Sequence, residues 1–142
     1  MKQRKLHIEL DFDFDLLGII SSVRSYKLAW SINNILDIDL QISEDITLLL
    51  AKEKSIVIAN YLYKTENSLF RLLKNKPVDS FNKNNLPLLP EMAHLDYLFL
   101  IEGATYPITI SDMLQKLKSL DTIEYILSIN VNDLKSKENL LF

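Results

Sequence analysis

Apolar and polar residues alternate without a break over Lys5–Leu16. This period of two predicts a strand with one solvent-exposed face. The exposed face would carry the three Asp residues of Asp11–Asp15, and a bend is expected there because Asp forms strands poorly. These carboxylates are interpreted as a solvated strand face, because the Gly and Glu of a calcium-binding loop are missing at the required spacing. A short buried strand is predicted next, over Leu16–Ile20.

Helical spacing of apolar residues predicts a first helix from Ser21 or Ser22 to about Leu36. Its apolar residues spread over roughly 240°, whereas a helix lying on one sheet face needs only about 100° of apolar surface. The surplus is expected to contact a second helix or another subunit, which makes Tyr26 and Trp30 candidate interface residues. For Trp30, packing is favoured over stacking on a ligand.

A second helix is predicted after Pro107. Thr109 and Asp112 have the spacing of a capping box. The residues that follow place an apolar side chain at intervals of three and four positions: Ile110, Met113, Leu114 and Leu117. This helix should therefore bury a single stripe.

The remaining strand-like segments are short and separated by turn-forming residues. They are Ile38–Ile42, Ile46–Ala51, Ile56–Tyr63, Leu69–Leu73, Leu95–Gly103 and Ile123–Asn130. The middle segments predict a meander with a turn across Lys52–Ser55, and a long polar loop is predicted over Asn75–Leu88. Leu95–Gly103 is apolar on both faces, as is typical of a strand in the interior of a sheet.

The order strand–helix–strand, meander, strand–helix–strand predicts an α+β fold in one domain over residues 1–142. We expect a mostly antiparallel sheet with two helices on one face, a ferredoxin-like variant with an inserted β-meander. The terminal unit is similar in pattern to ligand-sensing ACT-type domains. That likeness concerns the fold and leaves the function open.

The stretch from 89 to 97 reads LPEMAHLDY. It resembles the motif of the IPExxxVDY proteins, a family of the Bacteroidetes named for this pattern. Four residues match the motif as they stand: Pro90, Glu91, Asp96 and Tyr97. Two differ by an apolar replacement, with Leu89 in place of Ile and Leu95 in place of Val. The segment Tyr26–Trp30 followed by Asn33 also looks like the family's early region. The family is uncharacterised, so the resemblance implies a relative and no activity.

The motif has a structural and a chemical interpretation. In the structural one, Glu91 and Asp96 accept backbone N–H groups at a turn and at the strand start, and Tyr97 packs. In the chemical one, Glu91, His94 and Asp96 form an acid–base set or hold a divalent metal. The structural interpretation is favoured, because His94 falls at one of the motif's unspecified positions and Glu91 could join the other two only if the loop curled back.

Composition narrows the classes of function. The 142 residues are 48% apolar and 25% charged, which is typical of a globular domain. A net charge of −3 without a basic cluster argues against a nucleic-acid partner. The chain has no Cys and only two Gly, which excludes thiol chemistry and glycine-rich phosphate loops. Neither a secretion signal nor a membrane-spanning stretch is recognised, so a cytoplasmic location is expected.

These observations predict a non-catalytic cytoplasmic protein that acts through a protein–protein interface, as a homodimer, with no cofactor or metal. One alternative is an ACT-like domain that senses a small molecule. The other is an enzyme or metal site at Glu91, His94 and Asp96. The final residues, Leu140, Leu141 and Phe142, are too apolar to remain in water. They are expected to dock on the body of the fold or on a partner subunit, and they complete the candidate interface.

Overall fold

The alternating segments form the strands of one antiparallel sheet. The computed structural model describes residues 13–50, 54–76, 87–105 and 107–140. Its strands are β1 (Phe14–Ile20), β2 (Gln41–Leu50), β3 (Lys54–Lys64), β4 (Ser68–Lys74), β5 (Tyr97–Gly103) and β6 (Tyr125–Ile129). Their order in the sheet is β2-β3-β4-β5-β1-β6, and every neighbouring pair is antiparallel. The predicted α+β class and the meander from β2 to β4 are confirmed.

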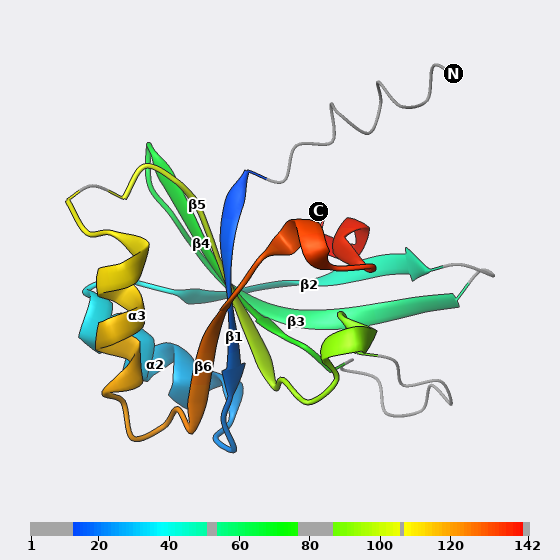
Figure 1. Cartoon of the computed structure of the whole chain (residues 1–142), viewed down its shortest axis with the longest axis horizontal. Helices are drawn as coiled ribbons and strands as arrows, with labels where there is room; N and C mark the ends of the chain where they lie inside the picture. The colour runs from blue at the N-terminus through cyan, green and yellow to red at the C-terminus, as the bar shows by residue number, and fades with distance from the viewer. Residues whose placement is uncertain (1–12, 51–53, 77–86, 106, 141–142) are drawn as a thin grey trace.

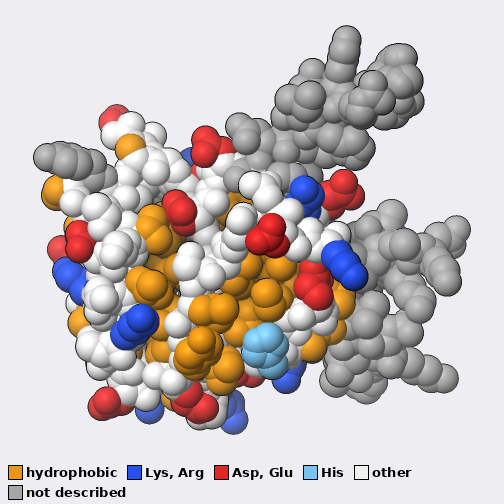
Figure 2. Space-filling view, viewed as in Figure 1, with side chains coloured by type: hydrophobic (Ala, Val, Ile, Leu, Met, Phe, Trp, Pro, Cys, Tyr) orange, Lys and Arg blue, Asp and Glu red, His pale blue; other side chains and the backbone are white. Residues whose placement is uncertain are grey.

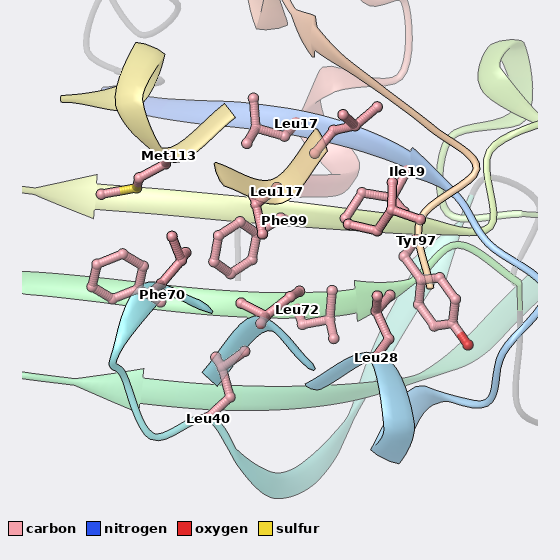
Figure 3. Close-up of a cluster of buried hydrophobic side chains, with 14 of the residues drawn as sticks. Leu17, Ile19, Leu28, Leu40, Phe70, Leu72, Tyr97, Phe99, Met113 and Leu117 are labelled. Carbon is pink, nitrogen blue, oxygen red and sulfur yellow. The ribbon is translucent and has the colours of Figure 1, made fainter. Parts of the chain in front are cut away.

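Two α-helices lie on one face of this sheet (Figure 1): α2 (Ser25–Leu36) and α3 (Ile110–Lys118). They bury a first core against alternate residues of β1, β4 and β5 (Figure 3). Leu28 of α2 and Leu117 of α3 are fully buried there with Phe99 of β5. Each such side chain contributes about 1.5–3 kcal/mol on burial. The prediction of two helices on one face is therefore confirmed.

Three short 3-10 helices and their flanking residues cover the opposite face: η2 (Pro90–Met92), η3 (Val131–Asp133) and η4 (Lys137–Leu140). They bury a second core with Leu16, Leu98 and Leu100 of the sheet. Leu140 is nearly fully buried in it, so this residue docks on the body of its own chain. Leu141 and Phe142 lie outside the described residues. Because both faces are covered, β5 is apolar on both sides, as its interior position requires.

The start of the first helix differs from the prediction. The helix begins at Ser25 behind an N-cap residue, Arg24, that makes no side-chain cap bond. Ser21 cannot serve as the cap because its hydroxyl donates to the Thr122 carbonyl and accepts from the Val23 N–H. The second helix begins as predicted, with a complete capping box between Thr109 and Asp112.

The two segments predicted as separate strands around position 44 form one strand, β2, with a bulge between Ser43 and Ile46. The buried Asn60 amide donates a 2.7 Å hydrogen bond to the Glu44 carbonyl at this bulge. This bond satisfies a backbone acceptor that the irregular strand pairing leaves without a partner. Lys54 and Ser55 of the predicted turn belong to β3, and residues 51–53 lie outside the described residues.

The N-terminal strand prediction is tested only in part, because residues 1–12 lie outside the described ranges. β1 pairs continuously with β5 from Phe14 onward, without a bend in this part. The helices of the described residues are all too short or too polar to cross a membrane.

Gly103 at the end of β5 has a φ of +91°, a backbone conformation that residues other than glycine rarely adopt. A Cβ here would also collide with the backbone carbonyl oxygen of Asn67, which accepts a 2.8 Å hydrogen bond from Ala104.

We expect Gly103→Ala to lower the free energy of unfolding by about 2 kcal/mol or more, measured by urea denaturation. The exposed neighbour offers a control, Ala104→Ser, which should stay within about 0.5 kcal/mol of the wild type. Equal stability of both variants would contradict the prediction.

Candidate functional site

The motif segment is anchored by two buried leucines that flank η2. Leu89 and Leu95 are fully buried in the second core. Pro90 stands at the first position of η2, where its missing N–H is not needed. Met92 donates to the Leu89 carbonyl and Leu95 donates to the Met92 carbonyl, so the turn is closed by its own backbone. This segment positions the polar residues of the motif.

Asn75, directly after β4, holds the segment in place through a fully buried side chain. Its Nδ2 donates 2.9 Å hydrogen bonds to the carbonyls of Met92 and Leu95, and its Oδ1 accepts from the Leu89 N–H. Its backbone bonds to Leu88 and Asp96 as well. The sequence places Asn75 in a polar loop between two lysines, where no periodicity marks it as buried. It is the residue of the site that the sequence prediction missed.

Glu91 reaches across to the C-terminal segment. Its carboxylate accepts from the backbone N–H of Ser136 at 2.9 Å and from the Ser136 hydroxyl. Slight burial acts to raise the pKa of the Glu91 carboxyl, but the hydrogen bonds from Ser136 and from nearby backbone groups act against it. The net effect is a pKa below the ordinary value. The acceptor role of Glu91 matches the structural interpretation, although its partner lies 45 positions away and not in its own turn.

Asp96 and Tyr97 connect the start of β5 to the chain that leaves β1. The Asp96 carboxylate accepts from the Ser21 N–H at 2.9 Å, and its own N–H donates to the Ile19 carbonyl. The Tyr97 hydroxyl donates to the Val23 carbonyl at 2.7 Å while its ring packs in the first core. Burial raises the pKa of this hydroxyl, which keeps the donor protonated. Both residues therefore fix the connection between β1 and α2.

Glu91, His94 and Asp96 do not gather into a metal site. The carboxylate of Glu91 faces Ser136, whereas that of Asp96 faces Ser21. His94 is exposed. Within residues 13–50, 54–76, 87–105 and 107–140, no three His, Asp or Glu side chains are grouped so that they could hold a metal ion. These three side chains therefore do not form the ligand set that the metal alternative requires.

The predicted interface residues include an exposed pair and a buried leucine, whereas Leu141 and Phe142 lie outside the described residues. Tyr26 and Trp30 of α2 are 64% and 65% exposed. The expectation that Trp30 packs is therefore wrong for packing against the rest of its own chain. The apolar arc of the helix is wider than the face that the sheet and α3 cover. Leu140 is buried in its own chain, which corrects its place among the candidate interface residues.

A pocket of about 410 Å³ opens where α2 ends. We call it the α2-end pocket. Three segments line it: the residues at and just after the end of α2, the turn between β3 and β4, and the connection from β5 to α3. The lining residues that carry the argument below are Leu36, Asp37, Thr65, Phe70, Thr105 and Met113. Its size lies in the range of small-molecule sites, about 300–1,000 Å³.

No protein-family model matches the chain. The curated proteins contain no match to it either. The resemblance to the IPExxxVDY family stays a prediction, and function has to be inferred from the residues themselves.

Replacing Asn75 tests whether the motif segment depends on this buried amide. Asn75→Ala leaves the Leu89 N–H and the Leu95 carbonyl without their partner in the interior, and it takes one of two donors from the Met92 carbonyl. Each unsatisfied group costs about 1–3 kcal/mol. We expect a loss of about 3 kcal/mol or more in the free energy of unfolding, measured with urea. Asn139→Ala is the control, because that amide donates a single half-buried bond to the Leu88 carbonyl. A loss at Asn75 no larger than at Asn139 would refute the assignment.

The lowered pKa of Glu91 predicts a pH dependence of stability. A carboxyl whose pKa is lower in the folded state contributes fully above the ordinary pKa of about 4.3. The contribution is lost as the pH falls through the folded-state pKa. The melting temperature of Glu91→Gln should therefore lie below that of the wild type at neutral pH and approach it as the pH falls below the ordinary carboxyl pKa. Glu66→Gln, in the exposed turn after β3, should follow the wild type throughout. A difference independent of pH would contradict the role of the charge.

Proposed function

We propose that the chain is a non-catalytic, cytoplasmic protein that works as a homodimer, with α2 as the contact surface. Membership of the IPExxxVDY family is part of this proposal. The observation that carries it is the exposed aromatic pair on α2, Tyr26 and Trp30. Aromatic side chains of this size are enriched where protein interfaces bind most strongly.

The two aromatic residues form one ridge because they stand four positions apart on a helix. Tyr26 and Trp30 each leave nearly two thirds of their surface in water, while Leu28, Ala29 and Ile32 of the same helix are buried. Burying a large aromatic side chain is favourable by about 1.5–3 kcal/mol. A partner that covers both rings would therefore gain substantial free energy from two residues.

Charge favours a second copy of the chain as this partner. The exposed cations Arg24 and Lys27 lie at the start of α2, and the exposed carboxylate of Asp39 lies just beyond its end. A two-fold axis perpendicular to α2 near Trp30 would set two α2 helices antiparallel, with each positive start beside the other helix's negative end. The helix dipoles would also oppose each other favourably.

A second apolar surface competes for this role. Figure 2 shows hydrophobic side chains gathered on the face where β6 crosses the centre of the view in Figure 1. Tyr125 of β6 is 55% exposed. However, β6 is only five residues long and also carries the exposed Ser128. We therefore assign the interface to α2 and use Tyr125 as the matched control.

Solution mass tests this assignment. Light scattering at tens of micromolar should give twice the chain mass of 16.5 kDa for the wild type. Tyr26→Ala combined with Trp30→Ala should give a monomer without a fall in melting temperature at low protein concentration, because neither ring packs in the core. Tyr125→Ala should remain dimeric. A monomeric wild type would overturn the homodimer proposal. If Tyr125→Ala alone dissociates the dimer, the interface lies on β6 and not on α2.

Small-molecule sensing is the second candidate, and the α2-end pocket favours it. The adjacency of β4, β5, β1 and β6 supports a ferredoxin-like βαββαβ unit with β2 and β3 as the inserted pair. Such a unit is the part of the fold that the ACT-like proposal needs. The pocket lies at the ends of α2 and β3, where the unit and the inserted strands join.

A further inference from the structure

We propose that the α2-end pocket binds a small organic cation, a primary amine with an apolar body. This inference rests on the second proposed function, small-molecule sensing, and names the chemical class of the ligand. Both the walls of the pocket and its charge favour this class.

The floor of the pocket is apolar. Leu36, Phe70 and Met113 line it and are almost completely buried. Phe70 stands between two other rings, with its centroid 5.8 Å from that of Tyr63 and 6.1 Å from that of Phe99. Packed rings hold the floor in one shape, and an aromatic face also attracts a cation. An aliphatic or aromatic body of moderate size therefore fits the floor.

The charge of the rim is negative. Asp37 is the one charged side chain among the described residues that line the pocket. It lies at the C-cap of α2 with a φ of 58°, in the left-handed region. The C-terminal end of a helix carries a partial negative charge, and the last turn of α2 holds no basic residue to offset it. The carboxylate and the helix end thus add their potentials at the same place.

The hydroxyl groups of the rim are already used by their own turns. The Thr65 hydroxyl interacts with Ser68, and the Thr105 hydroxyl donates to the Ile108 carbonyl at 2.7 Å. The nearby start of α3 is closed by its capping box and carries the acidic Asp112. An anionic ligand would consequently meet Asp37 and Asp112 without a cation among the described lining residues. A cation meets a favourable potential.

Three probes that share a phenylethyl body and differ in charge test the inference. They are 2-phenylethylamine, the neutral 2-phenylethanol and the anionic 3-phenylpropanoate, titrated by calorimetry into the full chain. The amine should bind most tightly, the alcohol more weakly and the anion not at all. Added salt should weaken the amine and leave the alcohol unchanged.

Two variants locate the binding. Asp37→Asn removes the charge with a residue that tolerates the left-handed conformation, and it should weaken the amine about tenfold. Asp39→Asn removes an exposed carboxylate two positions away, outside the pocket lining, and should leave the affinity unchanged. Melting curves establish that both variants fold. Equal affinity for the three probes, or an amine affinity unaffected by Asp37→Asn, overturns the inference.

The remaining outcomes separate this inference from the function on which it rests. Tighter binding of the anion overturns the cation assignment and leaves small-molecule sensing in place. Absence of binding by all three probes up to about 10 mM overturns the cation assignment as well. If a thermal-shift screen with amino acids and nucleotides then also raises no melting temperature, small-molecule sensing falls too.

Discussion

The buried amide of Asn75 is the interaction on which the second face of the sheet depends. An amide can satisfy two acceptors and one donor at once, and Asn75 uses all three toward the residues around η2. The end of β4 is thereby joined to the segment that starts β5. Leu88, Leu89 and Leu95 can enter the second core only because their backbone groups are satisfied at this point. Glu91, fixed on the same segment, then holds the C-terminal residues through Ser136.

Local patterns in the sequence predicted much of the fold. The capping box of α3, the end of α2 and the interior position of β5 depend on neighbouring residues, and all three are as expected. The start of α2 could not be predicted from the sequence, because the hydroxyl of Ser21 binds Thr122, a residue 101 positions away. The continuous β2 with its bulge likewise depends on a partner amide, Asn60, that no local pattern identifies.

The motif shows the same limit at the candidate site. Sequence reasoning selected Glu91, Asp96 and Tyr97 as polar groups with structural roles, but it could not name Ser136, Ser21 or Val23 as their partners. The exposure of Trp30 could not be predicted from the sequence either. An apolar arc around a helix does not reveal which part of it the rest of the fold leaves uncovered. The α2-end pocket could not be predicted either, because its three walls come from separate connections.

The pairing of β1 determines when this sheet can close. Ile19 pairs with Tyr97 on one side and with Ile126 on the other, so both neighbours of β1 come from far along the chain. While a ribosome synthesises the protein from its N-terminus, β1 and α2 emerge without any strand to bind. The meander from β2 to β4 can assemble early, whereas β1 presents two open edges until β5 and β6 have followed. High contact order of this kind slows folding and prolongs the exposure of apolar strands. The nascent chain consequently exposes apolar strand edges to aggregation until its last strand has been made.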